Sequence, residues 1–314
     1  MKRLFVYLGI TFAVTYACEF TLMAFSDTLT LMGASSVSQV VVALVMFVPL
    51  IGVAVTCAIF RDKFSLLPVR PNIRGNVKWY LVALFGPAVL SAAGAALFFA
   101  VHPESFDASM GYYTDMVVKQ AQAAGQAVDG GTARLALFGQ MLLAMTLAPF
   151  FNMIFAFGEE MGWRGYMMPK LCERVGPKGA VIVGGVIWGL WHAPITAMGH
   201  NYGLDYAGFP WLGILAMCCF CTVVGCLLTW LTFKVGSVWP AALAHGALNA
   251  VSGASVYFVK GGSYDPFVGP MPVGYIGGAA FIALAVVAYF ALDRSFCSFP
   301  VKTEPAAPDE VEAS

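Results

Sequence analysis

Long apolar segments leave this chain few folds that it could adopt. A membrane-spanning helix needs about 20 predominantly apolar residues, and about eight segments of the sequence meet that length. Only 11% of the 314 residues are charged and 60% are hydrophobic, whereas a soluble domain carries about 25% charged residues. The sequence therefore predicts an all-α, polytopic membrane bundle. The expected membrane-spanning segments are 4–25, 37–60, 78–101, 135–169, 179–198, 211–233, 238–258 and 272–292.

The fourth of these segments, 135–169, is too long for one simple crossing. Pro149 and Gly158 lie inside it, and kinks in long helices occur at such residues. Two arrangements are open: a single kinked span, or an extra helix ahead of the span that ends near residue 169.

One membrane domain, residues 1–298, accounts for the apolar part of the chain. Residues 61–78 are basic and amphipathic, which suits either a strip lying on anionic lipid headgroups or a solvated loop. Residues 102–134 are more polar and predict an external loop with a short helix. Residues 299–314 are acidic and rich in proline, which predicts a disordered cytoplasmic tail.

The distribution of lysine and arginine predicts how the chain is oriented. With alternating spans, thirteen of the 17 basic residues share the side of the N-terminus, three lie on the other side, and Arg164 lies within a span. Basic residues accumulate on the cytoplasmic side, so both termini are expected there. No basic cluster typical of nucleic-acid binding occurs. The expected partners are the lipid bilayer and a peptide or membrane-protein substrate.

Three ionisable residues interrupt the fourth apolar segment. A charge at the centre of a membrane costs about 2.5–3.5 kcal/mol on insertion scales, so such residues are functional candidates. Helical spacing places Glu160 and Arg164 one turn apart on one face, where they can pair. Glu159 points about 100° away from Glu160, over Trp163, and is expected to lack a charged partner. The alternative interpretation is a structural ion pair with one glutamate at a helix end.

Two later segments carry polar residues at helical spacing. His192 follows Trp188 by one turn, and Asn249 follows His245 by one turn. Gly246 leaves room for a neighbouring helix to approach closely. Taken singly, these histidines also fit buried structural roles. His102 and His200 fall in expected external loops and are not assigned to a site.

The three polar segments are expected to reach a similar depth in the membrane. Counted from the expected cytoplasmic surface at 1.5 Å per residue, Glu159 lies about 18 Å deep, His192 about 21 Å and His245 about 14 Å. The hydrocarbon core is about 30 Å thick. The sequence therefore predicts that these side chains share one internal cavity.

Such a cavity could hydrolyse peptide bonds in two ways. Glu159 could deprotonate a water molecule, while His192, His245 and Asn249 orient that water or stabilise the oxyanion. Alternatively, Glu159, His192 and His245 could hold a zinc ion with an open position for water. The HExxH signature of soluble zinc proteases is absent from the sequence. The residues alone leave the choice between the two open, and no other cofactor is predicted.

These residues resemble the motifs of the CPBP family, the CAAX-protease and bacteriocin-processing (Abi) intramembrane endopeptidases. Glu159, Glu160 and Arg164 match its EExxxR motif, and Trp188 and His192 match FxxxH with tryptophan in place of phenylalanine. His245 and Asn249 match HxxxN. The resemblance covers about residues 135–255, and the GWRG sequence that contains Arg164 is similar to that of the common bacterial subtype.

The resemblance implies an endopeptidase in a bacterial cytoplasmic membrane. It implies that Glu159 activates water, that His192, His245 and Asn249 complete the site, and that Glu160 and Arg164 support it. Members include glutamate-dependent proteases and metalloproteases, and act in CAAX processing or in bacteriocin maturation and self-immunity. Two other functions fit the residues: a non-catalytic membrane immunity or scaffold protein, and an ion-coupled transporter.

Overall fold

The computed structural model describes residues 1–31, 35–64 and 67–293, and this part of the chain consists of helices and their connections. The predicted disordered tail, 299–314, lies outside the described residues. The α-helices are α1 (Lys2–Leu31), α2 (Ser35–Val45), α3 (Val48–Phe60), α4 (Val77–Val101), α5 (Gly111–Ala123), α6 (Gly130–Thr146), α7 (Ala148–Glu160), α8 (Met168–Trp191), α9 (Ala193–Ala197), α10 (Trp211–Val235), α11 (Trp239–Val251) and α12 (Ala279–Ala291).

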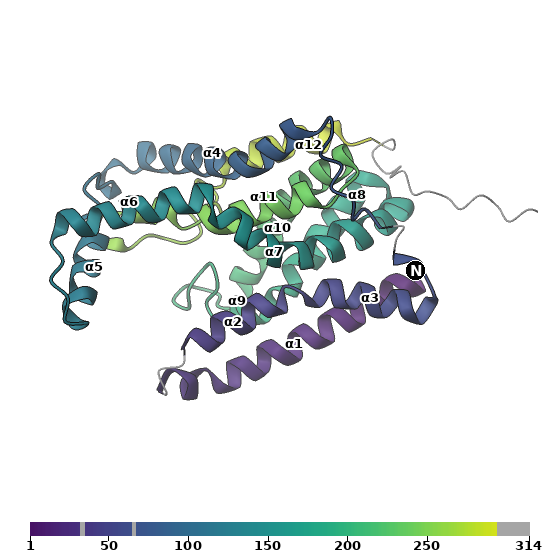
Figure 1. Cartoon of the computed structure of the whole chain (residues 1–314), viewed down its shortest axis with the longest axis horizontal. Coiled ribbons are helices and arrows are strands. Elements are labelled where there is room, and N and C mark those ends of the chain that lie inside the picture. Colours follow the sequence, from purple (N-terminus) through teal and green to yellow (C-terminus); the bar gives the residue numbers. More distant parts are fainter. Residues whose placement is uncertain (32–34, 65–66, 294–314) are drawn as a thin grey trace, which may run out of the picture.

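The helices form a bundle (Figure 1). Helices α1, α2 and α3 pack together along one side, and α4 and α12 lie along the other. Helices α7, α10 and α11 lie between these groups, and α8 packs against α10. The site described below is built from this central group, with α1 closing it on one side.

Several helices are long and apolar enough to span a membrane. Four helical segments pass on length and composition: 2–26, 36–60, 77–101 and 211–235. The pair α6 and α7–α8, which is bent by 49° at its break, would make a fifth. Large apolar side chains are exposed on most of the long helices, as a lipid-facing surface requires. The all-α membrane fold is confirmed, while the structure supports four or five spans and not the full set of eight.

Fewer spans are found than expected because an apolar segment is not always one continuous helix. The expected span 238–258 is helical only to Val251 and continues as a short 3₁₀ turn, Ala254–Phe258. The expected span 272–292 becomes helical only at Ala279. By contrast, the break in α8 at Gly176, whose φ of 71° and ψ of 170° are not helical, falls in the connection expected between 169 and 179.

In the region 130–167, a separate helix, α6, precedes α7, and the bent pair can also be counted as one span. The break falls at Leu147, two residues before Pro149 in the first turn of α7. Proline is tolerated there because the first helical N–H groups have no partner within the helix. Asp129 caps the start of α6 by accepting a hydrogen bond of 2.8 Å from the Thr132 backbone N–H. The polar region 102–134 contains the expected short helix, α5.

Close packing of α11 on α7 depends on Gly246. A Cβ atom at this position would lie 2.5 Å from the Met153 backbone nitrogen and 2.7 Å from the Pro149 carbonyl oxygen. Both neighbours are backbone atoms, so neither can move without shifting α7. The absence of a side chain at Gly246 therefore lets the helix that carries His245 approach the helix that carries Glu160.

Substituting Gly246→Ala is expected to destabilise the protein, although alanine favours a helix by about 0.5–1 kcal/mol over glycine. The added methyl group must push α11 away from α7, and overpacking of this kind costs about 1–3 kcal/mol. Thermal unfolding of the purified protein in detergent measures the effect. Gly139→Ala is the matched control, because open space surrounds that helical glycine. Equal unfolding temperatures for the two variants would contradict the account of this contact.

Candidate active site

The two adjacent glutamates lie at the end of α7, where the helix widens into a π-helical segment, Met161–Met167. Such segments occur frequently at functional sites. Glu159 is 2% exposed and Glu160 is fully buried. Consecutive residues on a helix point in different directions, so the two carboxylates meet different partners.

Glu160 belongs to a buried network with Arg164 and His245. Its Oε1 atom accepts hydrogen bonds from Arg164 Nη1 at 3.0 Å and from His245 Nδ1 at 2.9 Å. The Arg164 guanidinium also lies 4.1 Å from the centre of the Trp188 ring. The pairing of Glu160 with Arg164 is confirmed, and the contact with His245 ties α11 to the end of α7.

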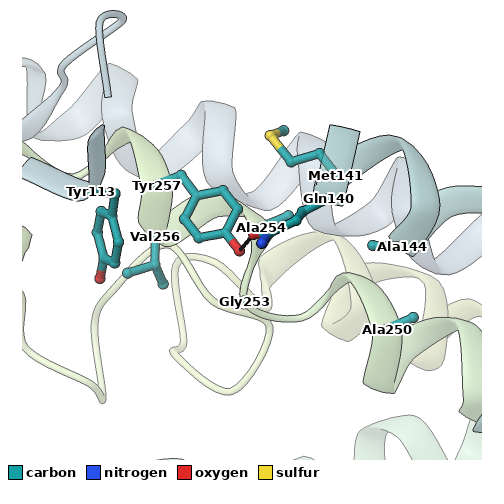
Figure 2. A pocket seen from close by; sticks show the side chains of 9 residues that line it. All are labelled: Tyr113, Gln140, Met141, Ala144, Ala250, Gly253, Ala254, Val256 and Tyr257. Atoms are coloured by element: carbon teal, nitrogen blue, oxygen red, sulfur yellow. Dashed lines mark hydrogen bonds between the residues drawn. The ribbon is translucent and has the colours of Figure 1, made fainter. Parts of the chain in front are cut away.

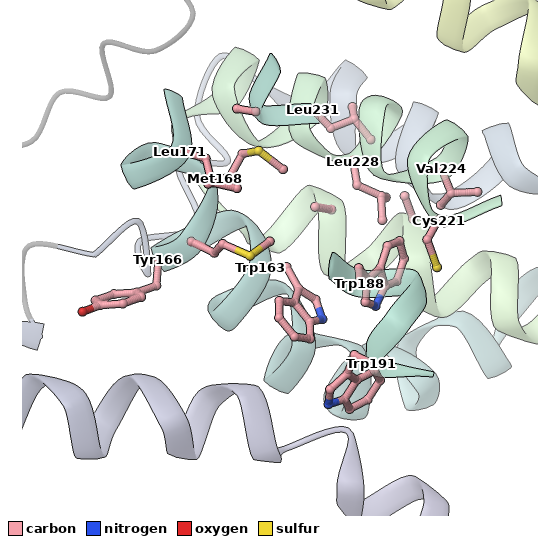
Figure 3. Close-up of a cluster of buried hydrophobic side chains, with 14 of the residues drawn as sticks. Trp163, Tyr166, Met168, Leu171, Trp188, Trp191, Cys221, Val224, Leu228 and Leu231 are labelled. Carbon is pink, nitrogen blue, oxygen red and sulfur yellow. The ribbon is translucent and has the colours of Figure 1, made fainter. Parts of the chain in front are cut away.

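Glu159 is held by two tryptophans. Its Oε2 atom accepts hydrogen bonds from Trp163 Nε1 at 3.2 Å and from Trp188 Nε1 at 2.7 Å. Figure 3 shows these two indoles beside that of Trp191 in the buried cluster. The prediction that Glu159 lies over Trp163 is confirmed. None of the described lysine or arginine residues forms an ion pair with it, but the indoles supply the donors that a buried carboxylate requires.

The tryptophan at 188 is therefore more than a bulky aromatic residue. In the motif match, Trp188 stands where the family pattern has phenylalanine. Phenylalanine has no N–H group and could not make the 2.7 Å hydrogen bond to Glu159. Its role depends on a contact across 29 residues of sequence, so spacing within its own helix gave no sign of it.

Both site histidines use their Nδ1 atoms for structural hydrogen bonds. His192 Nδ1 lies 2.9 Å from the Trp188 carbonyl oxygen, which can only accept, so this nitrogen carries the hydrogen. His245 Nδ1 is engaged by Glu160. In each neutral ring the Nε2 atom then remains as an acceptor, a geometry that suits binding of water.

One cavity of about 250 Å³ collects the expected residues. Glu159, Trp188, His192, His245 and Asn249 all line it. Asn249 is exposed and not buried as its expected position implied. Glu160 and Arg164 do not line the cavity and lie behind His245.

Two further residues of this cavity were not expected from the sequence. His200 lines it, and its ring stacks on His192 with centroids 6.4 Å apart and planes inclined by 6°. The assignment of His200 to a loop outside the site was therefore wrong. Glu19, on α1, also lines the cavity and is 2% exposed. A glutamate inside the first apolar segment was the signal that could have identified it.

Glu159, His192 and His245 are also the expected ligands of a zinc ion. Within the described ranges, no three His, Cys, Asp or Glu side chains are placed to hold a metal ion. Glu159 Oε2 already accepts from two indoles. The arrangement therefore does not fit a zinc ion held by Glu159, His192 and His245.

A second cavity, of about 310 Å³, lies beside the extracellular end expected for α11 (Figure 2). Tyr113, Gln140, Ala250 and Tyr257 are among its lining residues, and the Tyr257 hydroxyl donates a 3.1 Å hydrogen bond to Gln140 Oε1. None of the described residues lining this cavity is acidic or a histidine. It lacks the groups that acid–base chemistry requires.

Comparison with known proteins shows which proteins this part of the chain resembles. The model of the Rce1-like type II CAAX prenyl endopeptidases matches residues 135–251, which include all three polar motifs. The curated CAAX prenyl protease 2 of Methanococcus maripaludis is 30% identical over 93 residues, which cover 29% of this chain and 34% of that protein. The match thus spans about a third of the relative's length. Over residues 135–251, the chain is similar to the Rce1-like type II CAAX prenyl endopeptidases.

Proposed function

We propose that this protein is an intramembrane endopeptidase in which Glu159 activates the attacking water. The proposal rests on the position of the Glu159 carboxylate. It is buried and oriented by two indole N–H groups. It also lines the cavity that His192 and His245 line. The similarity of residues 135–251 to the Rce1-like endopeptidases supports a protease activity.

The proposed reaction begins with water held in this cavity. Glu159 accepts a proton from the water, and the resulting hydroxide attacks the peptide carbonyl. The second O–H group of the water donates to the Nε2 atom of His192 or His245, which positions the water. The Asn249 amide is a donor that can stabilise the tetrahedral oxyanion. Glu159 then returns its proton to the amine that leaves as the C–N bond breaks.

Glu160 and Arg164 serve this reaction indirectly. Their ion pair fixes Glu160 Oε1 where it binds His245 Nδ1, which sets the direction of the His245 ring. They are positioning residues rather than groups that touch the substrate. No step is assigned to a metal ion.

The substrate class proposed is a membrane-associated peptide or protein. The named relative is a prenyl protease, and processing of CAAX-type C-termini or maturation of bacteriocins are the two physiological roles to test. We also propose that the chain crosses a bacterial cytoplasmic membrane eight times, with both termini in the cytoplasm. The broken helices would then complete spans that helix length alone does not show.

The purified protein in proteoliposomes provides the test of function. Membrane-anchored peptides, some prenylated at a C-terminal CAAX sequence and others carrying bacteriocin-type leaders, are incubated with it and analysed by mass spectrometry. Cleavage within one class supports the proposal and identifies the role. Absence of cleavage, together with ion flux that depends on Glu159, would favour a transporter instead.

The hydrogen bond from Trp188 to Glu159 leads to a separate prediction. Trp188→Phe is expected to lower kcat about tenfold, because a hydrogen bond to a charged group contributes about 1.5–3 kcal/mol and 1.4 kcal/mol corresponds to a factor of ten. Trp239→Phe is the matched control, since its indole donates to the Val69 carbonyl oxygen at 2.7 Å and does not line the cavity. The two rates are compared on one peptide at equal protein concentration. Equal losses would mean that Trp188 acts only through packing.

A further inference from the structure

Glu19 is a buried carboxylate to which the proposed reaction assigns no role. It is 2% exposed, and its Oε2 atom has no hydrogen-bond partner among the residues that the structure describes. The backbone N–H of Ile195 hydrogen-bonds to the carboxylate. A buried carboxylate with an unused oxygen is energetically costly unless a partner reaches it.

The position of Glu19 is fixed by contacts one turn earlier on α1. The Thr15 hydroxyl accepts a 2.8 Å hydrogen bond from Trp191 Nε1, and the Tyr16 hydroxyl donates a 2.6 Å hydrogen bond to the Leu190 carbonyl oxygen. Residues 15 and 19 share one face of the helix. These contacts anchor α1 to the end of α8, directly before His192, and hold Glu19 at the wall of the cavity.

The charges around the cavity favour a cation. Glu19 and Glu159 both line it, whereas no lysine or arginine occurs among the described lining residues. Arg164, the nearby buried cation, is engaged by Glu160. Glu159 has two indole donors, so of the two carboxylates that line the cavity it is Glu19 that has a buried oxygen without a partner among the described residues.

Resting on the proposed function, we propose that Glu19 is a specificity-determining residue that binds a cationic side chain of the substrate, lysine or arginine, close to the cleaved bond. The ammonium or guanidinium group would donate to the Oε2 atom that has no partner. A substrate with this charge would recover the cost of burying Glu19, and a substrate without it would not.

The test uses one membrane-anchored peptide in which lysine or its uncharged isostere norleucine occupies each position around the cleaved bond in turn. At one position, wild-type protein is expected to cleave the lysine peptide with a kcat/KM about 10- to 100-fold higher. In Glu19→Gln this ratio should fall toward one. The glutamine keeps an oxygen for the Ile195 N–H, so a purely structural role predicts an unchanged ratio. Glu104→Gln, at an exposed loop residue, is the control and should keep the wild-type ratio.

Two results would overturn the proposal: no preference for lysine at any position, or a ratio unchanged in Glu19→Gln, whether or not both peptides are slowed equally. A second measurement needs no activity and no Glu19 variant. Butylammonium should raise the unfolding temperature of wild-type protein, and butanol at the same concentration should not. Equal shifts would overturn the proposal. If wild-type protein cleaves no peptide, the proposed function fails, while the butylammonium experiment still tests Glu19.

Discussion

Replacing Glu159 by glutamine is expected to abolish peptide cleavage while the protein still folds and inserts. Glutamine keeps the shape of the side chain and one oxygen that can accept from Trp163 and Trp188. It cannot take a proton from water, and a positioned general base contributes about 10²–10⁴-fold to a rate. The loss should therefore appear in kcat, with the yield and unfolding temperature of the purified protein close to wild type.

Glu173→Gln provides the matched control for this experiment. Glu173 is an exposed residue of α8, so the same chemical change there should leave cleavage intact. Both variants are reconstituted in liposomes and assayed on the peptide that wild-type protein cleaves. Retention of more than about a tenth of the wild-type rate by Glu159→Gln would contradict the assignment of Glu159 as the base, since a general base contributes at least about a hundredfold.

Replacing Arg164 by methionine is expected to lower the free energy of unfolding strongly. Arg164 is 1% exposed and Glu160 is fully buried, so the substitution leaves the Glu160 charge without its arginine. Breaking a buried ion pair by removing one partner costs about 3–5 kcal/mol. Only His245 would then remain to bind Glu160 Oε1. Denaturant unfolding in detergent measures the change in the free energy of unfolding.

Arg3→Met is the control for the loss of arginine. Arg3 pairs with Asp62 at 2.9 Å, but their side chains are 52% and 27% exposed, and surface ion pairs contribute about 0–1 kcal/mol. The double variant Arg164→Met, Glu160→Met should recover part of the stability lost in Arg164→Met, because it removes the stranded charge. A destabilisation by Arg164→Met no larger than that by Arg3→Met would refute the buried network.

Contacts set by helical spacing could be predicted from the sequence. Glu160 with Arg164 and Glu159 with Trp163 are four residues apart, and both bonds are present. The motifs also placed the site on three separate segments. The partner choices between segments could not be derived, because they depend on how helices pack. Helical spacing does not indicate why Glu160, rather than Glu159, should bind His245.

The missed residues have two different causes. Glu19 could have been found, because it is a carboxylate inside an apolar segment and meets the criterion applied to Glu159. His200 could not, because it lies in an irregular loop whose path no periodicity describes. For the fold, segment lengths identified the membrane class, and Gly176 breaks α8 within the connection expected between 169 and 179. The 3₁₀ turn Ala254–Phe258, however, falls inside an apolar run that suggested one continuous helix.

The central claim is that the buried carboxylate of Glu159, with the imidazoles around it, cuts peptide bonds in membrane-associated substrates. Peptide mass spectrometry of membranes from cells that produce wild-type or Glu159→Gln protein at equal levels tests it most directly. The account predicts new peptide termini, in or next to membrane-anchored segments, that occur with wild-type protein and are missing with the variant. The same set of termini in both membranes would contradict it.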